Sequence, residues 1–169
     1  MKPEIDKSSY VAKTAVIIGD VIIGKNCGIF PNAVIRGDQN TIKIEDGSNV
    51  QDCCVIHTDK EHEVKIGKNV SIGHGAIVHG ADIEEDCLIG MNVTILNGAK
   101  LGRGSVIGAN ALVKNNMDVP KNSLVLGIPG KIVKHDEKFR EMARLNAETY
   151  QKLSKEHLER KHPIYNSTE

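Results

Sequence analysis

Aliphatic residues, which we call anchors, recur along most of this chain at intervals of six. A second, mostly small residue follows each anchor by four positions, and this even spacing fits the alternation of a strand rather than the 3.6-residue period of a helix. The eighteen anchors are Val11, Ile17, Ile23, Ile29, Ile35, Ile44, Val50, Ile56, Ile66, Ile72, Val78, Ile83, Ile89, Ile95, Leu101, Ile107, Val113 and Val119. This hexapeptide pattern predicts an all-β solenoid, a parallel β-helix in which three hexads make one triangular coil, with about six coils.

Two interruptions and a set of glycines refine this prediction. Ile35 is nine residues from the next anchor and Ile56 is ten, which leaves room for short excursions that we expect to be functional loops. Glycine directly follows many anchors, and we expect it to turn the corners of the coil with a positive φ. These glycines are Gly24, Gly67, Gly73, Gly90, Gly102 and Gly108.

A different pattern begins after the last hexads. From Lys131 onward the repeat stops, and apolar residues then fall at helical spacing: Phe139, Met142, Ala143, Leu145, Tyr150, Leu153 and His157. We expect a helix over about residues 136–161, with Asp136 as its cap and Pro163 marking its end. The chain thus divides into a β-helix domain, residues 1–134, and a C-terminal segment, residues 135–169. The helix of that segment would pack on the β-helix or on a neighbouring subunit rather than form a separate domain.

Composition narrows the range of partners. The 169 residues include 22 Lys and Arg against 22 Asp and Glu, for a formal net charge of +0, and only two Phe, three Tyr and no Trp. Neither an electrostatic attraction to nucleic acid nor a base-stacking surface is indicated. No stretch approaches the roughly 18 apolar residues of a membrane span, and residues 1–10 lack the apolar core of a signal peptide. We therefore expect a cytoplasmic protein without nucleic-acid or membrane partners.

The cysteines have a structural interpretation. Cys27, Cys54 and Cys87 occupy the small-residue slot of their hexads, Cys53 is adjacent to Cys54, and no pair has the C-x-x-C spacing of a metal or redox motif. We predict that all four are free structural thiols.

Three of the seven histidines differ from the rest in their register. Counting three anchors per coil places Ile35, Ile56 and Val78 on one face, so His57 and His79, one residue after their anchors, stack about 4.8 Å apart. Two imidazoles at that separation can share a metal ion. His74 follows Ile72 by two residues and lies on the preceding face, so a neighbouring copy of the chain could supply it. Three imidazoles with an open fourth position form the catalytic zinc arrangement.

Several motifs together resemble the gamma-class carbonic anhydrase family over about residues 2–134. They are Arg36-Gly37-Asp38, Asn49-Val50-Gln51-Asp52, His57, Ile72-Gly73-His74-Gly75-Ala76 with His79-Gly80, and Leu88-Ile89-Gly90-Met91. The resemblance implies a homotrimer of left-handed β-helices with metal sites at the subunit interfaces. It also implies that His57 and His79 bind the metal from one subunit and His74 from its neighbour. Zinc is the usual metal in that family, and ferrous iron and cobalt are the alternatives.

The same resemblance implies roles for residues around the metal. Gln51 would orient the hydroxide that attacks CO2, with Asn49 supporting it. Arg36 and Asp38 would form an intersubunit ion pair, joined by Asp52, that holds the trimer and the site together. Such partners matter because they fix the tautomer and orientation of ligand histidines.

Two positions depart from the pattern of the well-known family members. Gln39 stands where they have a glutamate after the Arg-Gly-Asp run. The long acidic loop that supplies their proton-shuttle glutamate shrinks to residues 58–64, where Glu61 is the substitute that we include in the site, beside Asp59, His62 and Glu63. Tyr150 is the position from which a C-terminal helix would bring a tyrosine toward the metal.

The leading functional hypothesis is metal-dependent, reversible hydration of CO2 to bicarbonate by a homotrimer. One alternative is acyl transfer or thioester hydrolysis on a coenzyme A substrate, because the hexapeptide scaffold and the sequence Gly127-Ile128-Pro129-Gly130-Lys131 recur in acyltransferases. The other is a metal-binding assembly protein with little catalysis. Acetyl-CoA turnover that survives chelation would favour the first, and full metal occupancy without CO2 hydration would favour the second.

Overall fold

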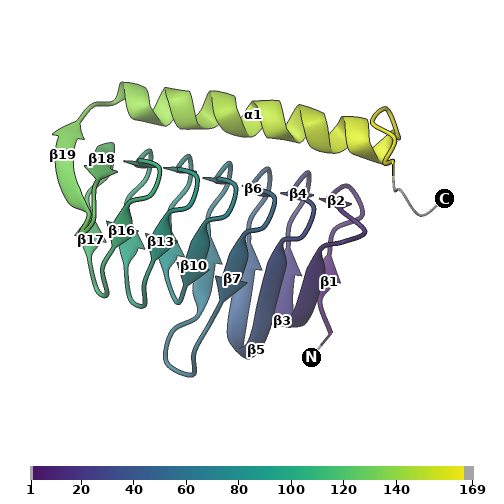
Figure 1. Ribbon diagram of the computed structural model, residues 1–169, viewed down its shortest axis with the longest axis horizontal. Coiled ribbons are helices and arrows are strands. Elements are labelled where there is room, and N and C mark those ends of the chain that lie inside the picture. The colour runs from purple at the N-terminus through teal and green to yellow at the C-terminus, as the bar shows by residue number, and fades with distance from the viewer. Residues whose placement is uncertain (1, 166–169) are drawn as a thin grey trace.

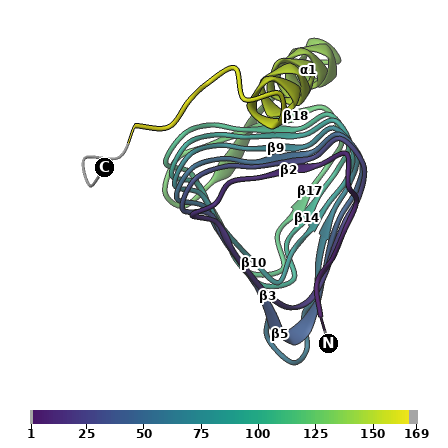
Figure 2. The ribbon, with the colours of Figure 1, turned by 90° about the vertical axis from the view of Figure 1, so that its right-hand side faces the viewer.

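A computed structural model describes residues 2–165, and it shows a parallel β-helix with one helix lying along its length (Figure 1). Seen end-on, the coils form a triangle with the helix above one side (Figure 2). The fold is a left-handed β-helix of about seven turns. The expected six coils gain a partial coil at each end, because Ile5 pairs with Ile23 and Val125 pairs with Ile107. Both residues keep the interval of six from the neighbouring anchors.

Three faces arise from the three strands of each coil. The helix-covered face contains β2 (Tyr10–Val11), β4 (Gly28–Ile29), β6 (Asn49–Val50), β9 (Ser71–Ile72), β12 (Leu88–Ile89), β15 (Val106–Ile107) and β18 (Ser123–Leu126). The apolar face contains β7 (Val55–His57), β10 (Ile77–His79), β13 (Thr94–Ile95) and β16 (Leu112–Val113). The charged face contains β1 (Glu4–Ile5), β8 (Val64–Ile66), β11 (Asp82–Ile83), β14 (Lys100–Leu101) and β17 (Asp118–Val119). Two long strands, β3 (Val16–Ile23) and β5 (Val34–Ile44), contribute to both the apolar and the charged face.

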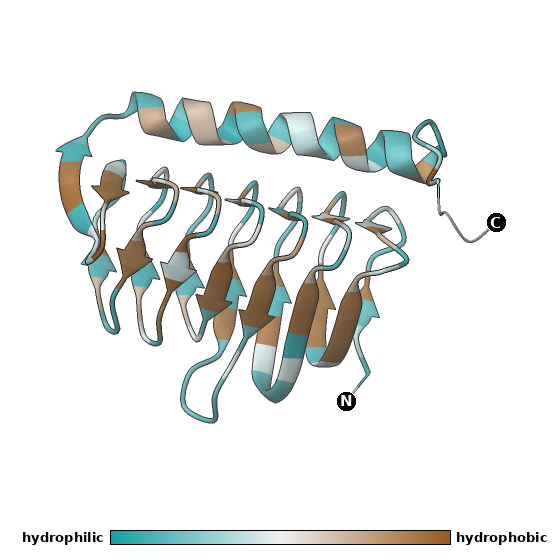
Figure 3. Cartoon of the chain, in the orientation of Figure 1, coloured by the Kyte–Doolittle hydropathy of each residue, from teal (hydrophilic) through white to brown (hydrophobic). Residues whose placement is uncertain are grey.

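The outward side chains give the two uncovered faces opposite chemistry. On the charged face the register aligns lysines with aspartates along the coils: Lys43, Lys65, Asp82, Lys100 and Asp118. On the apolar face it aligns Val16, Val34, Val55 and Ile77, and three of these are 37% to 46% exposed. Figure 3 shows the corresponding strands in brown. Exposed apolar rows are typical of surfaces that contact another protein chain.

The interior is filled by the anchors and the small residues that follow them by four. Ile29, Ile35 and Ile56 are fully buried, and so are Ala33 and Cys54 in the second slot. Stacking identical positions from coil to coil packs branched side chains against one another in a narrow prism. The hexad pattern is thus the pattern of a single continuous core.

The corners turn differently from the prediction. Positive φ occurs three residues after the anchor, mostly at asparagine, as at Asn32 and Asn92, and not at the glycines that directly follow the anchors. Asparagine tolerates this left-handed conformation better than most residues. The glycines after anchors are instead required by close approach, since a Cβ on Gly73 would lie 2.7 Å from the Ile89 carbonyl oxygen of the next coil.

The C-terminal helix, α1 (Lys138–Leu158), packs on the helix-covered face of its own chain. It follows β19 (Lys131–His135), which pairs antiparallel with β18. Asp136 accepts a hydrogen bond from the Lys138 backbone N–H at 3.0 Å, although the residue in the cap position is Glu137. Within the described residues, no helix has the length and apolar character needed to cross a membrane.

The buried side of α1 is smaller than the predicted apolar stripe. Ala143, Ala147 and Ser154 are buried, whereas Met142 and Leu145 are about half exposed. Small residues let the helix approach the coils closely, as the position of Ser154 beside Gly28 shows, where a Cβ would lie 2.2 Å from the serine hydroxyl. Met142 and Leu145 therefore do not pack on the coils of their own chain, and their packing on a neighbouring subunit stays a prediction.

All four cysteines are free, and three of them are buried. Burial raises the pKa of Cys54 to about 11 and that of Cys87 to about 12, and it raises the pKa of Cys27 as well. Since the thiolate is the reactive form, these three thiols are expected to resist modification at pH 8. We predict that a disulfide reagent modifies no more than one thiol per native chain, Cys53, and all four in denaturant. Rapid modification of a second thiol in the native protein would contradict the packing of the core cysteines.

Candidate metal centre

Two histidines meet at the end of neighbouring strands of the apolar face. The register pairs His57 of β7 with His79 of β10, as the hexad count predicts. Their ring centroids are 4.9 Å apart, and His57 Nδ1 lies 3.0 Å from His79 Nε2. We call this pair the two-histidine half-site.

The other nitrogen of each ring is held by an acceptor. His57 Nε2 lies 3.1 Å from Asp38 Oδ1, and His79 Nδ1 lies within hydrogen-bond distance of Asn97 Oδ1. Arg36 binds Asp38 at 2.7 Å, and its hydrogen bond is the main reason that the pKa of Asp38 lies below its ordinary value. An ionised carboxylate only accepts, so His57 carries its proton on Nε2. The facing nitrogens, His57 Nδ1 and His79 Nε2, are then both lone-pair atoms.

This arrangement fits a metal ion. Two neutral imidazoles whose lone pairs face each other at 3.0 Å cannot donate to one another, and a cation between them satisfies both. Nitrogen ligands of tetrahedral zinc at ~2.0–2.1 Å are about 3.3 Å apart, close to the observed separation. Ligand histidines whose second nitrogen donates to a carboxylate or an amide oxygen are typical of metal sites.

A second constellation surrounds His74, at the corner before β10. Asp52 Oδ2 lies 2.8 Å from His74 Nδ1, and the Tyr150 hydroxyl of α1 lies 3.3 Å from His74 Nε2. Burial and then the Asp52 charge raise the pKa of Tyr150, so its hydroxyl stays a donor. We call these residues, together with Gln51, the single-histidine half-site.

Gln51 and Asn49 belong to the single-histidine half-site. Gln51 is 4% exposed, and its Oε1 accepts the His74 backbone N–H at 3.2 Å. Its Nε2 donates to Asn49 Oδ1 at 3.1 Å, and Asn49 donates in turn to the Ser71 hydroxyl at 2.9 Å. These hydrogen bonds hold the Gln51 side chain beside His74. The role that the resemblance implies for Gln51, orienting a reactant, needs a side chain held in one place.

The two half-sites lie at opposite edges of the apolar face. His74 precedes β10 and His79 ends it, and among residues 2–165 no three His, Cys, Asp or Glu side chains gather into one metal-binding group. One chain therefore brings together two of the three predicted ligands. Within the chain, Arg36 binds Asp38. The two side chains are two residues apart on β5 and point to the same side. Within the same chain Asp52 pairs with His74, and the intersubunit ion pair of Arg36, Asp38 and Asp52 stays a prediction.

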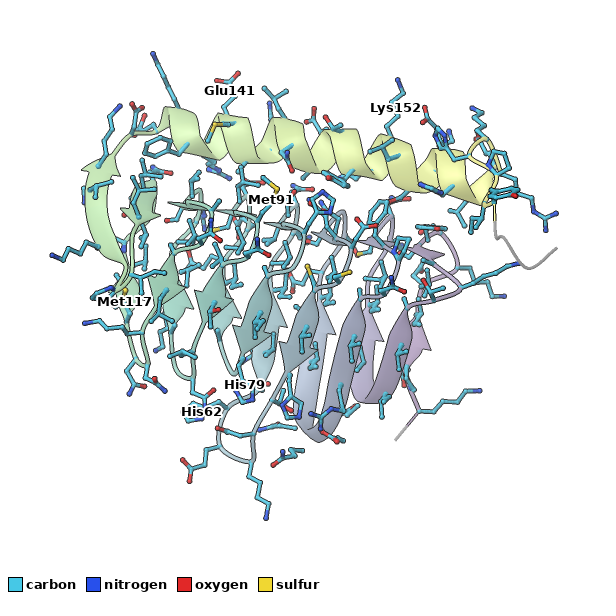
Figure 4. All side chains as sticks on the ribbon, in the orientation of Figure 1. His62, His79, Met91, Met117, Glu141 and Lys152 are labelled. Atoms are coloured by element: carbon cyan, nitrogen blue, oxygen red, sulfur yellow. The ribbon has the colours of Figure 1, made fainter. Side chains whose placement is uncertain are left out.

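The shortened loop, residues 58–63, borders the two-histidine half-site. Asp59 accepts hydrogen bonds from the backbone N–H groups of Glu61 and His62, at 2.9 and 2.8 Å, and its carboxylate also contacts His62 Nδ1 at 3.0 Å. Figure 4 shows His62 and His79 at this loop. The Glu61 side chain is exposed.

Sequence reasoning missed Asn97, which contacts His79. The register contains the signal, since Ile95 pairs with Val78 and thereby places the residues after Ile95 beside those after Val78. A pocket of about 370 Å³ adjoins the other half-site, between α1 and the coils. Gln51, His74, Asn146 and Tyr150 contribute its polar lining, and most of its other lining residues are apolar: Leu88, Ile89, Met91, Val106, Ile107 and Ala109.

Comparison with known proteins places the chain among hexapeptide-repeat proteins. The family described as "Bacterial transferase hexapeptide (six repeats)" matches residues 80–115. A crystal structure of a hexapeptide transferase family protein from Anaplasma phagocytophilum is 34% identical, covers 90% of this chain and 91% of its own, and has a TM-score of 0.87. The class defined by the fold is therefore a hexapeptide-repeat β-helix protein with paired histidine half-sites.

More similar relatives specify the family. The "Probable carbonic anhydrase" of Methanocaldococcus jannaschii is 52% identical over 152 residues, which cover 89% of this chain and 95% of that protein. The mitochondrial gamma carbonic anhydrase 1 of Arabidopsis thaliana is 35% identical over 92% of this chain and 59% of its own length. The carnitine operon protein CaiE of Escherichia coli is 38% identical over 89% and 78%, respectively. The chain belongs to the gamma-class carbonic anhydrase family.

Proposed function

We propose that this protein catalyses the reversible hydration of CO2 to bicarbonate at metal centres shared between the copies of a homotrimer. The observation that carries the proposal is the division of three histidines into two half-sites at opposite edges of one exposed apolar face. Members of the family form oligomers and act on a small substrate. A neighbouring copy would complete each centre by bringing His74 to His57 and His79.

The surface chemistry of the coils supports the shared site. The helix α1 covers one face, and the rows of Lys and Asp make the second face hydrophilic. Among the described strands, those of the apolar face expose a row of branched aliphatic residues. Val16, Val55 and Ile77 in that row lie between the two half-sites. Burying this row against a second copy would remove it from water and at the same time set the half-sites of neighbouring chains against each other.

The residues present would divide the chemistry between them. His57, His79 and His74 would hold the metal, which when bound lowers the pKa of a water ligand to about 7. Zinc is the metal that we propose, with Fe(II) or Co(II) as alternatives. Gln51, fixed by Asn49 and the His74 backbone, would orient the attacking oxygen with its amide. The apolar pocket beside it suits an uncharged molecule such as CO2.

Hydration converts CO2 and water into bicarbonate and one proton, which must reach the solvent. The raised pKa of Tyr150 keeps its phenol protonated, and once His74 Nε2 holds the metal instead of accepting from Tyr150, the hydroxyl would donate to the oxygen of the reactant. The loop of residues 58–63 lies beside the other half-site, and Glu61 at its exposed surface would pass the proton to buffer. With one short loop in place of a long acidic one, we expect proton transfer to limit turnover.

The test is stopped-flow CO2 hydration by protein purified without oxygen and loaded with zinc, Fe(II) or Co(II). We expect activity that disappears on chelation, and a kcat that rises with imidazole buffer concentration while kcat/KM stays constant, because the buffer replaces a slow internal proton carrier. No hydration by fully loaded protein would refute the proposal and favour a metal-binding assembly role. Acetyl-CoA turnover that survives chelation would favour the acyltransferase or thioesterase alternative.

A further inference from the structure

A chain of polar contacts leads from His79 into the loop of residues 58–63. His79 Nδ1 contacts Asn97 Oδ1, and Asn97 Nδ2 donates to Asp59 Oδ2. Asp59 is held by the backbone N–H groups of Glu61 and His62 and by the His62 ring. Asn97 and Asp59 are 38 residues apart in the sequence, so the coil stacking and the loop together create this contact.

The direction of this chain follows from which groups can donate. A primary amide presents an oxygen on one side and an NH₂ group on the other, so Asn97 alone could turn either toward His79. Asp59 as a carboxylate only accepts, and it therefore takes the NH₂ group and leaves the Oδ1 atom for His79. That oxygen accepts only a proton on Nδ1, which leaves the lone pair of His79 on Nε2, the atom that faces His57.

We propose that Asn97 is a positioning residue that fixes the tautomer of His79, and that Asp59 sets the orientation of the Asn97 amide for this purpose. The proposal rests on the metal centre proposed above, and it adds a role for two residues outside the ligand set. A carboxylate then determines the tautomer of each histidine in the two-histidine half-site. Asp38 accepts the His57 proton directly, and Asp59 orients the Asn97 amide that accepts the His79 proton.

The glycine at position 80 leaves room for the contact between Asn97 and His79. Gly80, directly after His79, has a φ of +57°, and a Cβ there would lie 2.7 Å from the His62 Cβ and 3.0 Å from Asn97 Oδ1. The equivalent slot one coil further, two residues after its anchor, is Asn115, which is exposed. Asn115 is thus a matched control with the same residue type and the same place in the hexad.

The experiment measures zinc affinity of the full-length chain by competition with a chromophoric chelator in four variants. Asn97→Ala removes the acceptor and is expected to weaken zinc binding by about 10- to 100-fold, the typical effect of losing a group that supports a ligand histidine. The double variant Asn97→Asp with Asp59→Asn keeps an acceptor for His79 and a donor between positions 59 and 97, with their order reversed, and is expected to stay close to the unchanged protein. Asp59→Ala frees the amide to rotate and should fall between them, and Asn115→Ala should change nothing.

A second measurement reads the tautomer itself. Long-range ¹⁵N–¹H spectra of the metal-free chain should show His79 with its proton on Nδ1, and Asn97→Ala should shift it to a mixture while Asn115→Ala does not. This readout does not depend on CO2 hydration, so an inactive but well-folded protein still tests it. Zinc affinity unchanged in Asn97→Ala, a double variant (Asn97→Asp with Asp59→Asn) as weak as Asn97→Ala, or an Nε2-protonated His79 in the unchanged protein would each overturn the proposal.

Discussion

Replacement of His79 by alanine is expected to lower the zinc affinity of this protein by a factor on the order of 10²–10³. Structural zinc sites contribute about 10–16 kcal/mol, which for four ligands is roughly 2.5–4 kcal/mol per ligand. Because 1.4 kcal/mol corresponds to a tenfold change in affinity, loss of one ligand gives the stated range. His57 would remain, but its Nδ1 atom would have lost the partner that lies 3.0 Å away.

The measurement is zinc content and affinity of the purified variant, together with its CO2 hydration rate. His135→Ala is the matched control, because that histidine is exposed on β19 and contacts only the Ser123 hydroxyl among the contacts described. It should keep the full metal content and rate. Full zinc binding by the His79 variant would show that the facing imidazoles are not metal ligands, and with it the proposed mechanism would be wrong.

Mixing two inactive variants is expected to restore part of the metal sites. In a cyclic trimer, each interface would take His74 from one copy and His57 with His79 from the next. Chains with His74→Ala and chains with His79→Ala each lack a ligand at every interface when purified alone. When they are produced together and assemble at random, each interface has two independent one-in-two chances, so about one quarter of the sites should carry all three histidines.

Zinc per chain and CO2 hydration of the co-purified mixture, compared with each variant alone, check this prediction. The matched control pairs His57→Ala with His79→Ala, since both changes fall in the same half-site and no mixture can restore it. Recovery in the control, or none in the His74 and His79 mixture, would contradict a centre shared between copies. Native mass spectrometry of the same sample measures the number of chains per assembly.

The sequence was sufficient to predict most of the fold and the contacts that follow its register. A period of six fixes which residues lie above one another, so the pairing of His57 with His79 follows from counting along the sequence. The resemblance added the amide pair of Asn49 and Gln51, which the structure places beside His74. Register arguments succeed here because stacked coils repeat one geometry with little freedom.

The predictions that differ from the structure concern close approach and excursions from the repeat. The glycines after anchors were expected to turn corners, but they make room for the backbone of the next coil. Of the predicted apolar stripe of α1, Met142 and Leu145 stay about half exposed, because small residues bring the helix onto the coils of its own chain. Asp59 meets Asn97 through a loop that leaves the hexad register, so no periodicity could place it.

By itself, the sequence determined the stacking of the coils, the residues of the core and the residues that lie beside each histidine in the neighbouring coils. These features depend only on the period of six, which every hexad repeats. Only the tertiary structure decided which face remains apolar and uncovered, how the two half-sites are separated across it, and which acceptor orients each imidazole. Those features depend on where the helix packs and on how side chains from distant coils and loops meet, and hydrogen-bond direction is set by such contacts rather than by spacing along the chain.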